Sequence, residues 1–202
     1  MRYSRKRVVI TGMGAITPLG ESVDEYWDNL VAGKSGIGPL TLVDASQFPS
    51  KIAGEVTGFD PAQYIEPRQA RRMARFSQMA VAASGVALED SEVNLSSEDP
   101  GRLGVVMGNG IGGFPTTEDN ARILVEKGGM KMSPFFISMI LPNMASANIS
   151  RIYGLKGYTS TVITACAAGN QAIGEAAVAI QRGVADLVVA GGCEAGICEI
   201  GL

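Results

Sequence analysis

Cys166 combines a reactive group with a local pattern that would expose it. It follows a β-branched run at residues 159–163 and precedes an alanine-rich run that predicts a helix over residues 168–182. A sharp turn from a strand into a helix presents a side chain openly, and the N–H groups at the helix start favour a thiolate or an oxyanion. Cys166 is therefore a candidate nucleophile toward an acyl carbonyl. The alternative is a buried free cysteine that packs as a small apolar residue.

The other titratable residues narrow the chemistry further. The sequence has no histidine, which excludes His-ligated zinc, Ser-His-Asp hydrolysis and an imidazole proton shuttle carried by this chain alone. Cys193 and Cys198 are separated by four residues and lack the further ligands of a zinc site. We interpret both as packed or loop thiols at the end of a strand, reduced as expected for a cytosolic chain.

Two glycine-rich segments need a physical interpretation. GMGAIT at residues 12–17 has Thr17 where a dinucleotide-binding turn has its third glycine, and the next helix begins only near Val23. This segment predicts a structural turn. GNGIGG at residues 108–113 is not followed by the Lys-Ser/Thr pair of a phosphate-binding loop. It suits close backbone approach, or the wall of a narrow apolar pocket with Ile111 exposed.

Four arginines recur at helical spacing. Arg68, Arg71, Arg72 and Arg75 fall within a helix predicted over residues 67–88 and would share one face. On a chain with a net charge of −3, this face is a local positive patch that could receive an acidic protein or a phosphate. The alternative is a solvated helix face with acidic neighbours elsewhere in the fold.

The elements that must position these residues alternate along the chain. The sequence is 202 residues long and 46% hydrophobic, which excludes disorder and suggests one large domain or a domain with an extension. No run approaches the length of a membrane span, and the mild acidity gives no overall nucleic-acid footprint. Apolar or β-branched runs predict strands at residues 7–11, 103–107, 158–163 and 186–192.

Helix signals fall between these runs. Ser22 with Glu25 forms a capping box and Gly33 would end that helix, and Gly154 would cap another. Further patterns predict helices over residues 67–88, 117–127, 143–153 and 168–182. Strands that alternate with helices, and strands without polar positions, indicate an α/β fold with a largely parallel sheet.

Four motifs in order give the sequence a family resemblance. RVVITGMG at residues 7–14, GIGG at 110–113, SPFF at 133–136 and TACAAG at 164–169 resemble those of the β-ketoacyl-[acyl-carrier-protein] synthases, most of all synthase II of type II fatty acid synthesis. The resemblance runs over residues 7–202. It implies a thiolase-like fold, layered α/β/α/β/α with mixed five-stranded sheets. Because the chain stops just past a strand, we expect residues 1–202 to form only the amino-terminal half of a ketosynthase domain.

The resemblance also implies an activity. Cys166 would accept an acyl chain as a thioester, and malonyl-carrier protein would lose carbon dioxide and attack it, as in a decarboxylative acyltransferase of fatty acid elongation. The family's catalytic histidine pair and lysine lie in its second half, so we expect this chain alone to be inactive. No cofactor and no metal is implied.

Further roles come from the same resemblance. Ile111 would line the acyl pocket, and Phe135 or Phe136 would reach across the interface of a homodimer into the acyl pocket of the partner. The strand before Cys166 would pair with its mate at that interface. Carrier protein would dock on basic side chains, namely Arg68, Arg71, Arg72 and Lys131. We expect a cytoplasmic protein with carrier protein and a second copy as partners, and neither nucleic acid nor membrane.

Other functions remain open at this point. The same fold could serve a non-catalytic partner that dimerises and binds carrier protein, although a cysteine at the nucleophile position argues against it. It could also serve a polyketide ketosynthase, or a thiolase-like acyltransferase that uses coenzyme A esters. A nucleotide-binding oxidoreductase fits least well, because the turn at residues 12–17 lacks the required glycine.

Overall fold

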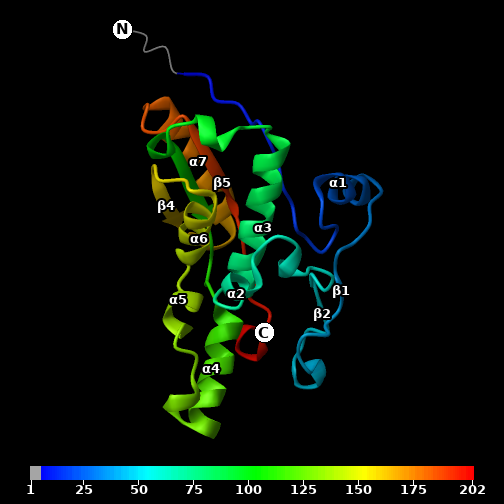
Figure 1. Cartoon of the computed structure of the whole chain (residues 1–202). Helices are drawn as coiled ribbons and strands as arrows, with labels where there is room; N and C mark the ends of the chain where they lie inside the picture. The colour runs from blue at the N-terminus through cyan, green and yellow to red at the C-terminus, as the bar shows by residue number, and fades with distance from the viewer. Residues whose placement is uncertain (1–5) are drawn as a thin grey trace.

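The centre of the molecule is a small parallel sheet (Figure 1). The structure, a computed structural model, describes residues 6–202. Three strands form the sheet in the order β4-β3-β5, with β3 (Leu103–Gly108) between β4 (Thr159–Val162) and β5 (Leu187–Gly192). Both pairings are parallel. These are three of the strands that the sequence predicts, each placed within one or two residues.

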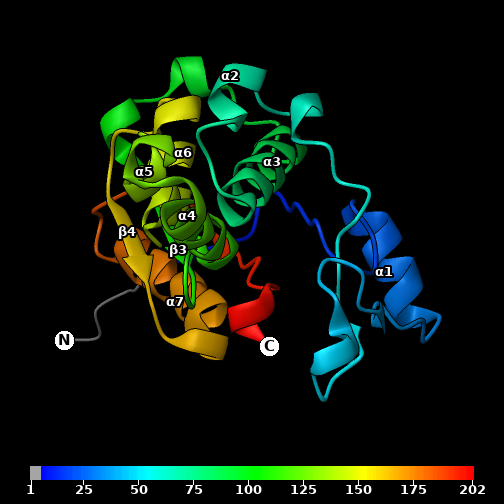
Figure 2. The ribbon, with the colours of Figure 1, turned by 90° about the horizontal axis from the view of Figure 1, so that it is seen from below.

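Helices cover both faces of this sheet (Figure 2). Alternate residues of β3 point to opposite sides: Val105 packs with α3 (Arg75–Asp90) and α6 (Met144–Tyr153), while Val106 packs with α7 (Ala168–Gln181). All six residues of β3 are buried, as expected for a strand covered on both faces. The described residues therefore form three layers, α/β/α, and the α/β class is confirmed.

Local signals explain several helix boundaries. Ser22 caps α1 (Val23–Val31) by accepting from the Glu25 N–H, and α6 ends at Gly154 with the left-handed φ of 70° that favours glycine. Two features differ from the prediction. Helix α4 (Phe114–Lys127) begins three residues before residue 117, with a proline in its first turn. A short helix that the sequence did not predict, α5 (Phe136–Ile140), precedes α6.

The helix predicted over residues 67–88 is two helices. After α2 (Pro67–Ala70) the chain turns, and Ala74 adopts an extended conformation before α3 begins. Met73 and Ala74, at this break, are both buried in the main core. The Gln78 side chain donates to the carbonyls of Ala70 and Met73, at 2.9 and 3.3 Å. These bonds provide partners for two carbonyl groups at the break between the helices.

The strand predicted at residues 7–11 is also wrong. These residues pair with no strand among residues 6–202, and Val9 and Ile10 are exposed. The chain instead runs along α3: a Cβ at Gly14 would lie 2.0 Å from the Ala83 carbonyl oxygen. The main sheet of the described chain thus has three strands rather than the five that the resemblance implied.

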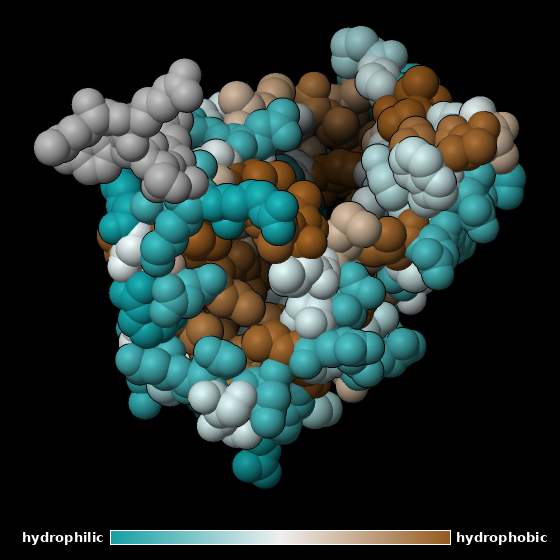
Figure 3. All heavy atoms as spheres, turned by 90° about the horizontal axis from the view of Figure 1, so that it is seen from above, coloured by the Kyte–Doolittle hydropathy of each residue, from teal (hydrophilic) through white to brown (hydrophobic). Residues whose placement is uncertain are grey.

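Residues 17–53 extend away from the layered body (Figure 1). This segment contains α1 and a two-stranded antiparallel ribbon, β1 (Gly38–Pro39) with β2 (Ile52–Ala53). Trp27, Val31 and Ile37 are exposed apolar side chains on it. Figure 3 shows apolar side chains gathered in hollows of the upper face and on the part of the molecule where this segment lies. Of the helices between residues 6 and 202, none could span a membrane.

Candidate active site

Three loops meet at the carboxyl edge of the parallel sheet. Gly108 at the end of β3 is aligned with Val162 of β4 and Gly192 of β5. The segment after β3 carries Ile111, the segment after β4 carries Cys166, and the segment after β5 carries Glu194. Because parallel strands end at the same edge of a sheet, residues far apart in sequence gather there, as is usual for ligand sites in α/β folds.

Cys166 lies in a tight turn between β4 and α7. Residues Ala165–Ala167 form one 3₁₀ turn, in which the Ala167 N–H donates to the Thr164 carbonyl at 3.1 Å. Ala165 has a φ of 51°, a left-handed conformation that is uncommon for alanine. The Cys166 side chain is exposed, and α7 begins two residues later. The sharp strand-to-helix turn predicted from the sequence is present.

Glycine allows this turn to sit tightly on the sheet. A Cβ at Gly108 would lie 2.2 Å from the carbonyl carbon of Ala168, the first residue of α7. A Cβ at Gly192 would lie 2.8 Å from the Cα of Gly169. Side chains at these two positions would push α7, and Cys166 with it, away from the strand ends.

The N–H groups of the glycine-rich loop are already used. Those of Gly110 and Ile111 donate to one carboxylate oxygen of Glu194, at 2.8 and 3.1 Å. The Gly112 N–H donates to the Asn109 side chain, and the Gly113 N–H to the Ile140 carbonyl at 3.0 Å. A carboxylate occupies the place that a bound anion would take. The loop is therefore not arranged to cradle a phosphate, consistent with its interpretation as a wall.

Ile111 lies near the cysteine turn. Its side chain is 49% exposed, and its Cδ1 packs so closely on Gly196 that a Cβ there would lie 2.9 Å away. A Cβ on the preceding residue, Gly110, would lie 3.9 Å from the Cα of Ala165. The loop backbone at Gly110 thus lies next to the turn that bears Cys166, while the Ile111 side chain itself packs on Gly196. Its part in binding an acyl chain remains a prediction.

The SPFF segment contacts the arginine-rich turn. Phe135 precedes α5 and is partly exposed, and the Arg72 guanidinium lies 4.5 Å from its ring centroid. Phe136 is the first residue of α5 and is half-buried. The structure therefore joins one predicted acyl-pocket residue to one predicted docking residue through a cation–π contact.

The four arginines do not share one helical face, because the predicted helix is broken between them. Arg68 lies in α2, Arg71 and Arg72 lie at its end, and Arg75 is the first residue of α3. Arg75 lies 4.6 Å from the Phe59 ring centroid and donates to the Val56 carbonyl. Exposed basic side chains remain at Arg68, Arg71, Arg72 and Lys131. Their docking role stays a prediction.

The other two cysteines are packed against protein groups. The Cys193 thiol lies 3.8 Å from the Gly108 carbonyl oxygen, and burial raises its pKa to about 12. Burial also raises the pKa of Cys198, and so does the neighbouring Glu118 carboxylate. Within residues 6–202, no His, Cys, Asp or Glu side chains cluster in a way that could hold a metal ion.

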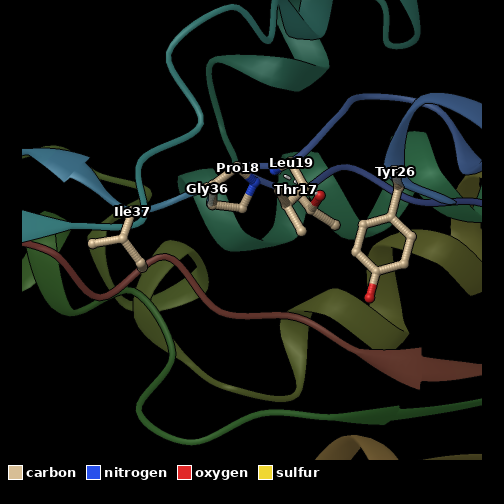
Figure 4. Close-up of a pocket in the computed structure, with 6 residues that line it drawn as sticks. All are labelled: Thr17, Pro18, Leu19, Tyr26, Gly36 and Ile37. Carbon is tan, nitrogen blue, oxygen red and sulfur yellow. Dashed lines mark hydrogen bonds between the residues drawn. The ribbon is translucent and has the colours of Figure 1, made fainter. Parts of the chain in front are cut away.

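A separate hollow lies on the segment around α1. It has a volume of about 290 Å³ and is lined by apolar groups of Pro18, Leu19, Tyr26 and Ile37 (Figure 4). None of the predicted site residues lines it.

Sequence reasoning missed Asn109 and Glu194. Asn109 is buried, and its side chain donates to the Cys193 carbonyl and accepts from the Gly112 N–H. Asn109 directly follows β3, and Glu194 comes two residues after the end of β5. Polar groups at the carboxyl ends of two parallel strands were the available signal.

Comparison with known proteins shows which family the sequence resembles. The family profile described as "Beta-ketoacyl synthase, N-terminal domain" matches residues 5–202. Curated relatives include the 3-oxoacyl-[acyl-carrier-protein] synthase 2 of Synechocystis sp., 44% identical over 97% of this chain and 47% of its own length. The relative of that name from Coxiella burnetii is 43% identical over 98% of this chain and 48% of its own. The chain spans about half the length of these relatives.

Solved structures agree with the sequence comparison. The ishigamide ketosynthase/chain length factor superposes with a TM-score of 0.90 at 31% identity, over 98% of this chain and 49% of its own. A type II polyketide ketosynthase, solved with its acyl-carrier protein and a hexaketide, superposes with a TM-score of 0.85 at 32% identity, over 98% and 53%. The thiolase-like layering implied by the motifs is the fold of these neighbours.

Proposed function

This chain belongs to the β-ketoacyl synthase family through the family's N-terminal domain, and on that premise we propose that its protein is a 3-oxoacyl-[acyl-carrier-protein] synthase with Cys166 as the acyl acceptor. The acyl donor is an acyl-carrier protein and the extender is malonyl-carrier protein. The reaction lengthens an acyl chain by two carbons in fatty acid synthesis, and the protein acts in the cytoplasm.

The chemistry has two steps. The Cys166 thiolate attacks the carbonyl of the donor thioester, and the carrier-protein thiolate leaves as the new carbon–sulfur bond forms. Malonyl-carrier protein then loses carbon dioxide, and its carbanion attacks the acyl-Cys166 carbonyl, which releases the Cys166 thiolate. The Cys166 N–H is one donor to the oxyanion. The chain has no histidine, so any imidazole in the second step must come from outside it.

The exposed Cys166 in its strained turn is the observation that carries the proposal. Of the three cysteines it alone is exposed, and Ala165 before it holds a left-handed φ. Strain of this kind concentrates at functional sites. The exposed Ile111, in the loop next to this turn, offers apolar contact to an acyl chain. The N-terminus of α7 directs its N–H groups toward the Cys166 turn.

Exposed arginines support docking of a carrier protein. Arg68, Arg71 and Arg72 present positive charge at the α2–α3 turn, and the Arg72–Phe135 contact links this turn to the segment that includes Lys131. Acidic protein surfaces are attracted to such patches. A second copy of the protein is the further partner that we propose, with β4 at the interface.

The proposal is tested by condensation with defined donors. The whole protein that carries this sequence is incubated with acyl-carrier protein and malonyl-carrier protein, and the β-ketoacyl product is measured. We expect product with the wild type, none with Cys166→Ala, and undiminished product with Cys198→Ala. Equal product from wild type and Cys166→Ala would sink the proposal.

A polyketide ketosynthase is the second candidate, because one of the solved neighbours is the ketosynthase of a type II polyketide system. The curated relatives named as fatty acid enzymes are more similar, at 43–44% identity against 31–32%. The two candidates differ in their donors. Efficient use of β-ketoacyl chains over saturated chains in the same assay would favour the polyketide function.

A further inference from the structure

Beyond the roles proposed above, we infer that Glu194 is a positioning residue that fixes the loop at residues 109–113 and so sets where Ile111 stands beside Cys166. The inference rests on the proposed function, because it concerns which acyl chains fit at Cys166. It assigns Glu194 the part of a specificity determinant that acts through Ile111 without touching the reacting atoms.

The contacts of the Glu194 carboxylate are directed at the loop backbone. One oxygen accepts from two consecutive N–H groups, those of Gly110 at 2.8 Å and Ile111 at 3.1 Å. The other oxygen lies 3.4 Å from the Asn109 amide nitrogen. Hydrogen bonds to a charged acceptor are stronger than neutral ones. The carboxylate therefore holds the backbone of Ile111 itself.

The fit around this carboxylate is tight. A Cβ at Gly110 would lie 2.6 Å from the accepting oxygen of Glu194 and 3.9 Å from the Cα of Ala165. Gly110 thus lies between the Glu194 carboxylate and the turn that bears Cys166. A shift of the loop changes the space beside the nucleophile directly.

Asn109 fixes the same loop from its buried side. Its side chain accepts from the Gly112 N–H and donates to the Cys193 carbonyl, which joins the ends of β3 and β5. Beyond it, a Cβ at Gly112 would lie 2.3 Å from the Ile140 carbonyl oxygen of α5. The two ends of the loop are held by the core, and Glu194 holds the middle, where Ile111 is exposed.

Glu194 can be tested without disturbing the core, because its side chain is exposed. Glu194→Gln keeps an oxygen that can accept from both N–H groups, although it loses the charge. Glu194→Asp keeps the charge but is one methylene too short to reach them. Glu194→Ala removes both. Glu89→Gln, on the exposed end of α3, is the matched control.

Two readouts separate the outcomes. The first is amide hydrogen exchange at Gly110 and Ile111, which we expect to be about tenfold faster in the Ala and Asp variants and near the wild-type rate in Gln. The second is the ratio of Cys166 acylation rates with a long and a short acyl-carrier protein. We expect this ratio to change about tenfold in Ala and Asp, and to stay at the wild-type value in Gln and in the control.

The result that overturns the inference is specific. If Glu194→Asp behaves as the wild type and Glu194→Gln behaves as Glu194→Ala, the effect comes from the charge of Glu194 and not from its hydrogen bonds to the loop. If exchange quickens while the acylation ratio stays constant, the loop does not set acyl selectivity. If the wild type is not acylated at all, the proposed function fails, and the exchange rates still report whether Glu194 holds the loop.

Discussion

At the scale of single residues, Cys166 and Cys193 differ in solvent exposure, and this difference determines which thiol can react. Cys166 is exposed at a turn, whereas the Cys193 sulfur faces the Gly108 carbonyl and the Asn109 amide. Burial raises the pKa of Cys193 to about 12, from 9.0 for a free thiol. Only the exposed thiol is available to a carbonyl substrate, and the buried one has consequences for stability instead.

The raised pKa of Cys193 predicts an alkaline loss of stability. An acid whose pKa is higher in the folded state contributes fully below the unfolded pKa of 9.0, and the contribution is lost as pH rises toward 12, since the unfolded thiol then ionises and the folded one does not. The slope from this group is at most about 1.4 kcal/mol per pH unit. Cys193→Ser should flatten the decline.

Urea midpoints of wild type and Cys193→Ser, measured from neutral pH to about pH 11, check this. Burial raises the pKa of Tyr153 as well, so both proteins retain some alkaline decline, and the difference between them isolates the thiol. Parallel declines across the range would contradict the assignment.

At the scale of elements, the close approach of α7 to β3 depends on the absence of a side chain. A Cβ at Gly108 would lie 2.2 Å from both the carbonyl carbon and the carbonyl oxygen of Ala168. Gly108→Ala should destabilise the protein by about 1–3 kcal/mol, because backbone must move. The control is Gly174→Ala, within α7 itself, where nothing lies within 4 Å of the added carbon. This substitution should stabilise the protein by about 0.5–1 kcal/mol.

Thermal unfolding of the two variants provides the comparison. Gly108→Ala should also change the rate at which an alkylating reagent modifies Cys166, because the turn moves with α7. If Gly108→Ala unfolds at the wild-type temperature, the packing of α7 on the sheet is looser than described.

The α2–α3 turn carries the second prediction at this scale. Arg71→Glu reverses an exposed charge that has no role in the core, so it should raise the KM for carrier-protein substrates about tenfold, with an unchanged kcat. Arg182→Glu, also exposed but at the end of α7, is the control. Steady-state kinetics at low and high salt check this, since the effect should shrink with ionic strength. An equal change in both variants would mean that net charge, and not this turn, attracts the carrier.

Sequence reasoning succeeded where residues within one element determine that element. The apolar run of β3, the Ser22 cap and the Gly154 end are local signals, and each is present. It failed where tertiary contacts decide. The break at Met73 and Ala74 lies where both side chains enter the core. Residues 7–11 pair with no described strand, although their β-branched pattern is typical of one, and the chain that follows them packs on α3 at Gly12 and Gly14.

The site follows the same division. The turn at Cys166 was predictable because strand, small residues and helix are contiguous. The hydrogen bonds of Glu194 with the N–H groups of Gly110 and Ile111 join residues more than eighty positions apart in the chain. A sequence without a known sheet order gives no reason to pair them, and only the alignment of β5 beside β3 brings them together.

At the scale of the whole molecule, β4 is an edge strand of the sheet, and within residues 6–202 no strand pairs with its outer side. The carbonyls of Tyr158 and Val162 accept from β3, so those of Thr159 and Thr161 face outward, since strand groups alternate. An unpaired edge is a template for another strand. We expect two copies to pair through β4 in the whole protein.

Proline at an outward position tests this pairing. Thr159→Pro removes an N–H that faces away from β3, so the fold should survive while the edge can no longer pair. Sedimentation should show a dimer for the wild type and a monomer for the variant, with similar circular dichroism spectra. An unchanged dimer would place the interface elsewhere.

The acyl group on Cys166 is the central claim, and direct mapping tests it. The whole protein is incubated with an acyl-carrier protein, without malonyl donor, then digested and analysed by mass spectrometry. The account predicts one acyl group on the peptide that contains Cys166, present in Cys193→Ser and lost in Cys166→Ala. Acylation of another residue, or retained acylation in Cys166→Ala, would contradict it.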